Sequence, residues 1–219
     1  MRLLRAGEES VWISTDGVRL EGTLGVPSSA SGLILFAHGS GSSRHSPRNN
    51  FIANQFRKAG FATLLFDLLT HDEDLTYKTR FDITLLAGRL VAATRWAADN
   101  ESVAGLPIGY FGASTGAAAA INASVIMGQA VSAVVSRGGR PDMSGDYLNM
   151  VTVPTLLIVG GADSVVLELN KAAADRIPAE KELAIIPGAT HLFEEPGALE
   201  EAARLATEWF LKRLINKSE

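Results

Sequence analysis

The 219-residue chain contains no cysteine, and this absence removes several kinds of chemistry at once. Disulfide bonds, thiolate metal sites and a cysteine nucleophile are all excluded. An excess of charge of one sign is also lacking, because 20 basic residues stand against 24 acidic ones and the formal net charge is −4. Such a chain has no broad positive field that would attract a phosphate backbone, so a nucleic-acid partner is not expected.

Long apolar runs and linker-like segments are missing as well. No apolar stretch approaches the ~18 residues that a membrane-spanning helix needs, so no membrane association is expected. The N-terminal segment MRLLRAGEESVWI carries charges at Glu8 and Glu9, which argues against a signal peptide and predicts a cytoplasmic protein. No stretch rich in proline, glycine or serine divides the chain and no internal repeat is evident, so residues 1–219 are predicted to form a single domain.

What the chain does contain is a series of short apolar runs that alternate with helix-like segments. Asp16-Gly17 lies between two β-like runs and favours an opening hairpin, because glycine accepts the positive φ of a tight turn. Uninterrupted apolar runs such as LILFA and TLLIV are typical of parallel strands buried on both faces. Helices are expected over residues 47–59, 81–98, 144–150 and 197–214, and from residues 115 and 165 onward. Eight strands with interleaved helices predict an α/β fold: a mostly parallel, doubly wound sheet with helices on both faces.

Three polar residues that suit catalysis stand just past predicted strands. Ligands of such sheets bind outside the carboxyl ends of the strands, so these positions are the first candidates for a site. Ser114 lies in GASTG, Asp163 follows TLLIVGG and His191 follows ELAIIPG. Their chain order, Ser then Asp then His, fits a catalytic triad on an α/β sheet. Ser114 is the predicted nucleophile, His191 the predicted base and acid, and Asp163 the group that would orient the imidazole.

The residues around Ser114 suit a sharp turn. Gly112 and Gly116 leave room for a strand-to-helix elbow that exposes the serine Oγ, although the pattern alone also fits a simple helix cap. Backbone N–H groups at the start of the following helix can stabilise a developing oxyanion. Thr115 N–H is one candidate donor, and Ser40 N–H in the small-residue turn HGSGSS is the other.

Other residues compete for these roles. Asp142 follows the run AVSAVVS and is a rival for the acid position. His38 could be taken for the base, but a His-Gly pair in this turn more often shapes the loop by hydrogen bonding. His45 is expected to be solvated. The run HDED, residues 71–74, suggests a metal site, but four consecutive loop residues cannot easily all reach one ion, so a solvated loop is favoured and neither metal nor cofactor is expected.

A second group of residues could bind substrate. Four arginines stand in predicted loops at or just past strand ends: Arg44, Arg48, Arg137 and Arg140. Two guanidinium groups that converged on the pocket would favour a substrate with a carboxylate or phosphate group, whereas the alternative is that they pair with acids such as Asp142 or Asp146. The candidate substrate-binding residues are His38, Gly41, Arg44 and Arg137.

The motifs AHGSGSS, GASTG, VGGADSVV and PGATHLF together resemble the oxyanion loop, nucleophile elbow, acid loop and histidine loop of the α/β-hydrolase superfamily, and more narrowly of its dienelactone hydrolase-like branch. The resemblance covers nearly the whole chain and implies the strand order 1-2-4-3-5-6-7-8 with the second strand antiparallel. Ser114 stands where dienelactone hydrolases proper have cysteine, which favours an ordinary serine carboxylesterase. The short spacing between AVVSRGG and PTLLIVGG leaves no room for a large cap, so a small substrate is expected.

The sequence therefore predicts a metal-independent serine hydrolase that cleaves small carboxylic esters through an acyl-enzyme. A dienelactone or other lactone hydrolase, an acyl thioesterase and an acyltransferase use the same machinery and stay open as alternatives. A ligand-binding module without turnover is the alternative outside the enzymes, because a fold does not determine a function. A small-molecule ester is the expected partner, and the sequence is compatible with a monomer or a homodimer.

Overall fold

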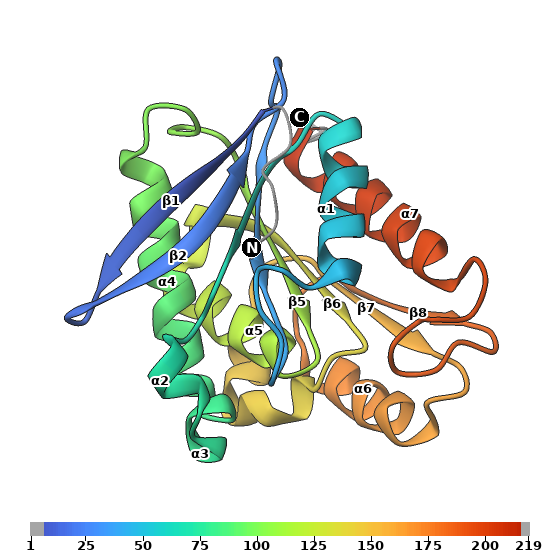
Figure 1. Cartoon of the computed structure of the whole chain (residues 1–219). Helices are drawn as coiled ribbons and strands as arrows, with labels where there is room; N and C mark the ends of the chain where they lie inside the picture. Colours follow the sequence, from blue (N-terminus) through green and yellow to red (C-terminus); the bar gives the residue numbers. More distant parts are fainter. Residues whose placement is uncertain (1–6, 216–219) are drawn as a thin grey trace.

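Eight strands form one sheet within residues 7–215, the part of the chain that the computed structural model describes (Figure 1). The strands are β1 (Glu8–Thr15), β2 (Val18–Gly25), β3 (Leu33–Ala37), β4 (Ala62–Phe66), β5 (Ile108–Ala113), β6 (Val131–Arg137), β7 (Thr155–Gly160) and β8 (Lys181–Ile186). Their order is β1-β2-β4-β3-β5-β6-β7-β8. Strand β2 runs antiparallel to both neighbours, and β3 to β8 are mutually parallel. The predicted strand order and the antiparallel second strand are confirmed.

The first hairpin forms where the sequence predicts it. Asp16 and Gly17 adopt φ of 45° and 78°, the positive values that a two-residue hairpin turn requires. This turn pairs β1 with β2 along their full length, from Thr15 opposite Val18 to Glu8 opposite Gly25. The hairpin forms one end of the sheet (Figure 1).

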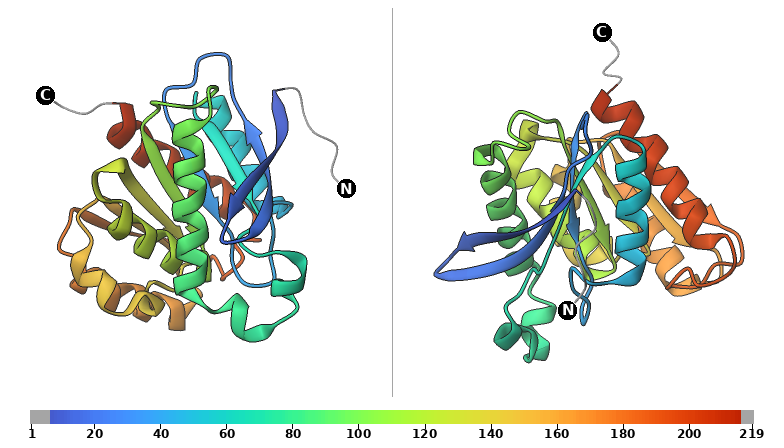
Figure 2. Two further views of the ribbon diagram at one scale, coloured as in Figure 1. Left: turned by 90° about the vertical axis from the view of Figure 1, so that its left-hand side faces the viewer. Right: turned by 45° about the horizontal axis from the view of Figure 1, so that its top comes forward.

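Helices cover both faces of the sheet. They are α1 (Pro47–Lys58), α2 (His71–Asp74), α3 (Tyr77–Arg80), α4 (Ile83–Asp99), α5 (Thr115–Met127), α6 (Ser164–Arg176) and α7 (Ala198–Phe210), with short 3-10 segments at Gly128–Ala130 and Pro141–Met150 and a π turn at Leu211–Ile215. Helices α1 and α7 lie side by side on one face, and α4 and α5 pack together on the other (Figures 1 and 2).

The hydrophobic core has two layers, one on each face of the sheet. Alternation along β3 divides its side chains between them: Leu33 and Leu35 join the layer under α4 and α5, and Ile34 and Phe36 join the layer under α1 and α7. All four are buried. The uninterrupted apolar run of β3 therefore reflects burial on both faces, as expected for a parallel strand.

Several predicted boundaries move, each for a local reason. The HDED segment is not a loop but helix α2, which begins after a capping box: Thr70 Oγ1 accepts from the Glu73 N–H, and the Glu73 carboxylate accepts from the Thr70 N–H. The helix expected from residue 81 begins at Ile83 because the Asp82 side chain caps it. The segment expected over 144–150 already begins at Pro141 and is kinked at Gly145, whose φ is 57°.

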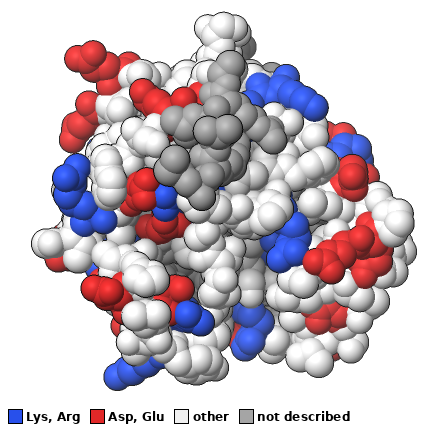
Figure 3. All heavy atoms as spheres, in the orientation of Figure 1, with Lys and Arg blue, Asp and Glu red and all other residues white. Residues whose placement is uncertain are grey.

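The surface carries both signs of charge. On the face drawn in Figure 3, lysine and arginine side chains are interspersed with aspartate and glutamate. No helix within the described range is both long and apolar enough to cross a bilayer. Residues 1–6, on which the expectation of no signal peptide partly rests, lie outside the described residues.

Candidate active site

Ser114 occupies the turn between β5 and α5 in a conformation that is unfavourable for any residue with a side chain. Its φ is 52° and its ψ is −123°. Positive φ at a non-glycine residue persists only where the surrounding structure enforces it, and such residues cluster at functional sites. Ser114 stands at the N-cap position of α5, yet its side chain makes no capping hydrogen bond. The hydroxyl is therefore not used as a helix cap, which was the alternative interpretation of this serine.

The flanking glycines explain how this turn is enforced. A Cβ at Gly112 would lie 2.5 Å from the Cα of Ala117, and a Cβ at Gly116 would lie 2.1 Å from the carbonyl oxygen of Ala37. Both distances are far below contact distance and both involve backbone atoms. The two glycines of G-x-S-x-G thus allow α5 to begin directly against β3 and β5, which leaves Ser114 at the end of the sheet.

The loops after β7 and β8 bring Asp163 and His191 together. His191 Nδ1 lies 2.8 Å from Asp163 Oδ2, and the Ala162 N–H donates to the Ala189 carbonyl at 2.9 Å, which holds the two loops in contact. A carboxylate at Nδ1 favours the tautomer with the proton on Nδ1, so Nε2 is available to accept a proton. The rival acid, Asp142, is instead held by Arg140, whose Nε and Nη2 donate to its two oxygens at 2.9 and 2.8 Å.

The histidine loop is fixed at both ends. The backbone N–H and hydroxyl of Thr190 donate to the Glu195 carboxylate at 3.1 and 2.5 Å, and these bonds lower the pKa of Glu195. Phe193 has a φ of 57°, and its buried ring packs against Gly138 and under the guanidinium of Arg137, 5.4 Å from the ring centroid. Two residues away from His191, the backbone is thus held by packing onto the end of β6.

A pocket of about 230 Å³ contains Ser114 and His191 together. Its other lining residues are Gly39, Ser40, Ser42, Ser46, Arg48, Asn49, Ala113, Arg137, Gly138 and Leu192. Loops from the ends of β3, β5, β6 and β8 therefore meet at one opening. Asn49 was not foreseen from the sequence; it is buried and its Oδ1 has no hydrogen-bond partner among the described residues. The run PRNNF does not indicate that Asn49 lines a pocket, because that position depends on the direction in which α1 begins.

The two predicted oxyanion donors lie side by side. Thr115 is the first residue of α5, where the backbone N–H has no partner within the helix. The Ser40 N–H donates to the Thr115 hydroxyl at 2.9 Å, and Ser40 lines the pocket. The side chain of Thr115 thus ties the loop that follows β3 to the elbow, a contact that the motifs do not indicate.

His38 holds the loop that follows β3 in shape through hydrogen bonds of its ring. Its ring is buried, Nδ1 lies 3.0 Å from the Gly39 carbonyl, and Nε2 accepts from the Leu68 N–H at 3.0 Å. These bonds assign the proton to Nδ1, and burial lowers the pKa of His38. The ring is therefore neutral and fully engaged, as expected for a residue that shapes the turn, and it does not line the Ser114 pocket.

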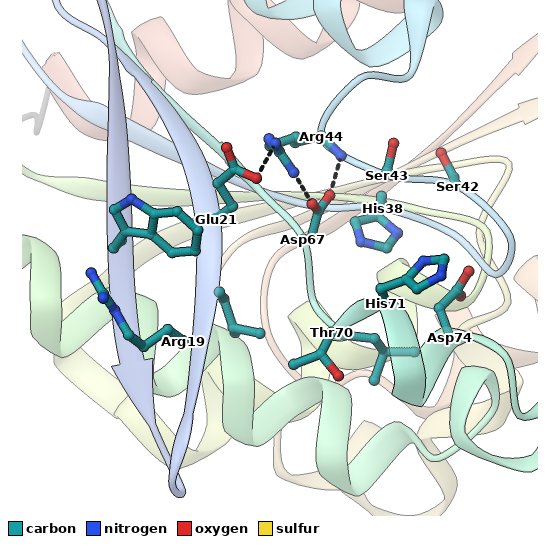
Figure 4. Close-up of a pocket in the computed structure, with 13 residues that line it drawn as sticks. Arg19, Glu21, His38, Ser42, Ser43, Arg44, Asp67, Thr70, His71 and Asp74 are labelled. Atoms are coloured by element: carbon teal, nitrogen blue, oxygen red, sulfur yellow. Dashed lines mark hydrogen bonds and ion pairs between the residues drawn. The ribbon is translucent and has the colours of Figure 1, made fainter. Parts of the chain in front are cut away.

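Two further candidates for substrate binding lie away from Ser114. Arg44 points into a second cavity of about 380 Å³, where it pairs with Asp67 and Glu21 (Figure 4). Gly41, with a φ of 67°, lies in the loop beside Arg80 and is not part of the Ser114 pocket. Of the four residues named from the sequence, only Arg137 lines the pocket that contains the serine.

Arg137 stands apart from the other loop arginines. It is 7% exposed, and its Nε and Nη1 are buried without a hydrogen-bond partner among residues 7–215. Burial, and to a smaller extent the charge of Arg48, lowers the pKa of Arg137 to about 10. By contrast, Arg48 pairs with Glu194 at 2.9 Å and Arg140 pairs with Asp142.

Two of the acidic residues of α2 are used in ion pairs. Glu73 pairs with Arg89 at 2.8 Å and Asp74 with Arg80 at 3.1 Å, while His71 is exposed. Within residues 7–215, no group of three or more His, Asp or Glu side chains is arranged to hold a metal ion.

Solved structures of other proteins resemble this chain. No family model matches the chain. A solved dienelactone hydrolase of Anabaena variabilis is 52% identical with a TM-score of 0.92, over 94% of this chain and 98% of that one. An esterase of Pyrococcus furiosus is 20% identical with a TM-score of 0.73, over 94% and 93% of the two chains, which is a likeness of fold alone.

The curated relatives of this chain carry a different name from the solved relative. Proteins from two strains of Mycobacterium tuberculosis, each provisionally named a phosphoribosyl transferase, are 55% identical over 207 residues. This match covers 94% of the present chain but 47% of each relative. The chain thus spans about half the length of the curated relatives that it matches.

Proposed function

Because the chain belongs to the dienelactone hydrolase family of the α/β-hydrolase superfamily, we propose that it is a serine hydrolase that cleaves small carboxylic esters through an acyl-enzyme. One observation carries the proposal: a serine held at positive φ shares a pocket with a histidine whose Nδ1 is 2.8 Å from a carboxylate. The residues are Ser114, His191 and Asp163. No structural need of the turn explains a serine in this conformation, since its side chain caps nothing.

The proposed reaction has two steps. Ser114 Oγ attacks the ester carbonyl while its proton passes to His191 Nε2, and the tetrahedral intermediate expels the alcohol, which takes that proton. Water then gives a proton to Nε2 and attacks the acyl-serine, and the acid leaves as the proton returns to Oγ. Asp163 holds the imidazole in the tautomer that can accept the proton and stabilises the imidazolium.

The oxyanion would be bound by the backbone N–H groups of Ser40 and Thr115. The Ser40 N–H donates to the Thr115 hydroxyl, but a negatively charged oxygen is a stronger acceptor than a hydroxyl and can replace or share this bond. The hydroxyl would then hold the loop in place before substrate arrives. Thr115→Ser should keep this bond and most of the activity, whereas Thr115→Val should lower kcat by about tenfold.

A fluorophosphonate probe tests the nucleophile directly. We expect a covalent adduct that mass spectrometry locates at Ser114 and that Ser114→Ala abolishes. His191→Ala should lower kcat by about 10⁴-fold or more, and Asp163→Asn by about 10⁴-fold. Lack of labelling under conditions that label a control esterase would refute the proposal and favour a binding module without turnover.

A lactone is the second candidate substrate, because the solved relative at 52% identity is a dienelactone hydrolase. A panel of alkyl esters of increasing chain length, with lactones and acyl thioesters beside it, compares these classes by kcat/KM. A phosphoribosyl transferase activity is not proposed for this chain, because the match covers only 47% of the relatives that carry that name.

A further inference from the structure

A single tight turn separates the pocket that contains Ser114 from the second cavity. The Ser42 N–H donates to the Gly39 carbonyl at 3.1 Å, and Gly41 has a φ of 67°, as the third residue of a type II turn requires. Ser40 lines the Ser114 pocket, whereas Ser42 lines both that pocket and the second cavity. A molecule whose ester group lies at Ser114 therefore reaches the second cavity across Ser42.

The two cavities differ in size. The Ser114 pocket, of about 230 Å³, is smaller than the roughly 300–1,000 Å³ of most small-molecule sites, whereas the second cavity, of about 380 Å³, lies within this range. The Ser114 pocket thus suits the ester group with a short acyl chain, and the second cavity suits a larger part of the same substrate.

The charged groups of the second cavity compensate one another. Arg44 pairs with both Glu21 and Asp67. Asp74 pairs with Arg80 at 3.1 Å. An anion would meet the carboxylates, a cation would have to displace an arginine from them, and an apolar ligand would take them out of water without a new hydrogen bond. The cavity is therefore suited to a neutral ligand that both donates and accepts hydrogen bonds.

Polar groups lie on both walls of this cavity. Arg19 and Glu21 stand on the β1–β2 hairpin, and Ser42, Ser43 and His71 stand on the opposite side (Figure 4). A serine hydroxyl donates one hydrogen bond and accepts two, and a carboxylate in an ion pair keeps lone pairs that accept. Ligand hydroxyl groups have the same double capacity, so a polyol can bond to both walls.

Trp12 adds an apolar surface to the hairpin wall. It stands opposite Glu21 in the β1–β2 pairing, and the Arg19 guanidinium lies 4.9 Å from the centroid of its ring. The side chain is nevertheless 49% exposed. A tryptophan that lies between polar groups and water can pack its ring against the C–H face of a ligand while the polar groups bond the ligand's edge.

We propose that the second cavity binds a neutral, hydroxyl-rich ring, a sugar or a related cyclic polyol, that forms the alcohol part of the ester. This proposal rests on the proposed hydrolase function and names the class of its substrate. Ser114 Oγ takes the acyl group, the bond between the acyl carbon and the sugar oxygen breaks, and that oxygen receives the proton from His191. The polyol is thus the first product, and the acid follows when water attacks the acyl-serine.

Three acetate esters with the same six-membered ring test the proposal. Methyl glucopyranoside 6-acetate carries three hydroxyl groups, tetrahydropyran-2-ylmethyl acetate carries none, and the 3-sulfate of the first adds a negative charge. We expect the wild-type protein to prefer the glucoside acetate over the tetrahydropyranyl ester by about 30-fold in kcat/KM, the effect of two net hydrogen bonds. The sulfated ester should be the poorer substrate of the two sugar esters, because its charge meets the carboxylates of the cavity.

Substitutions assign the preference to the second cavity. Trp12→Ala should lower the ratio of kcat/KM for the glucoside acetate to that for ethyl acetate about tenfold, and Trp12→Phe should restore most of it. Ser42→Ala should lower the ratio of the glucoside acetate to the tetrahydropyranyl ester about fivefold. Tyr77→Ala is the matched control, because Tyr77 is an exposed aromatic residue that lines neither cavity; both ratios should stay at their wild-type values.

Binding of a sugar without an ester separates this proposal from the hydrolase function. Of the three tryptophans in the chain, Trp12 is the one that lines the second cavity. Methyl glucopyranoside should therefore change the tryptophan fluorescence of the Ser114→Ala variant. Adding Trp12→Phe should remove this change, while calorimetry still detects the sugar.

Two results would overturn the polyol site even if Ser114 reacts with the fluorophosphonate. One is equal turnover of the glucoside and tetrahydropyranyl esters together with no binding of methyl glucopyranoside. The other is a preference for the glucoside acetate, or for its sulfate, that is unchanged in Trp12→Ala and Ser42→Ala. If Ser114 is not labelled but methyl glucopyranoside binds and its signal depends on Trp12, the hydrolase function fails and the polyol site stands.

Discussion

Replacing Arg137 with methionine should make the protein more stable. Burial and the charge of Arg48 lower the pKa of Arg137 from its usual value to about 10. At about 1.4 kcal/mol for each tenfold change in proton affinity, this lowering corresponds to about 3 kcal/mol. Because folding lowers the pKa, the charge destabilises the folded state at every pH below about 10, and the effect ends only as the pH rises from there towards the ordinary pKa.

Methionine has a similar length and no charge, so it removes this term and leaves the pocket filled. It also loses the contact with the Phe193 ring, which offsets about 1 kcal/mol. We therefore expect Arg137→Met to raise the free energy of unfolding by about 1–2 kcal/mol, or the melting temperature by about 3–6 °C for a chain of this length. Urea unfolding followed by circular dichroism measures the change, with an unchanged m-value as the check that the same states are compared.

Arg89 provides a control of opposite sign. It is 3% exposed, but it donates to Glu73 Oε1 at 2.8 Å and to the Thr15 carbonyl at 3.1 Å. Arg89→Met breaks these bonds and should lower the free energy of unfolding by about 2–3 kcal/mol. If Arg137→Met instead destabilises the protein by 1 kcal/mol or more while the native spectrum is kept, the guanidinium has favourable partners and the reasoning about its isolation is refuted.

The remaining predictions concern the elbow and the loop behind it. Ser114→Gly should abolish activity yet raise the free energy of unfolding by about 1 kcal/mol in urea titrations, because glycine accepts positive φ; Ser114→Ala keeps the strain and should show no such gain. Gly116→Ala should lower the free energy of unfolding by about 3 kcal/mol or more, because its Cβ would meet Ala37 O at 2.1 Å, whereas Gly88→Ala in α4 meets nothing and should stabilise by about 0.5–1 kcal/mol. His38 has a pKa lowered by burial, so the unfolded chain binds the proton first and stability should fall as the pH drops below about 6.5; an identical pH dependence of the urea midpoint in His38→Gln would contradict this.

The sheet could be predicted from the sequence because its strands are short apolar runs without polar alternation. A parallel strand such as β3 is buried on both faces, so its composition alone distinguishes it from the helices around it. The elbow could also be predicted, because the backbone packed around Gly112 and Gly116 leaves no room for a Cβ at either position. These are requirements of the backbone, and they are visible in the residue types.

What the sequence could not predict depends on the direction of side chains. Four arginines in similar predicted loops are equivalent in the sequence, but Arg44 and Arg140 pair with carboxylates while Arg137 is buried at the pocket that contains Ser114. The bond between the Ser40 N–H and the Thr115 hydroxyl likewise joins two loops that no local pattern connects. The short helix α2 is different, because Thr70 and Glu73 have the spacing of a capping box and would have indicated a helix start.

The position of the histidine loop after the last strand has a consequence for how the protein is made. Strand β5 and the strained elbow come before β6, β7 and β8 in the chain, and β8 forms one end of the sheet. At roughly 5–20 residues per second of synthesis, Ser114 leaves the ribosome several seconds before His191 has been made. The nascent chain therefore carries Ser114 without His191 during this interval. Reactivity towards a serine-directed probe would then appear only when β8 has joined the sheet, and its appearance would report that this end of the sheet has formed.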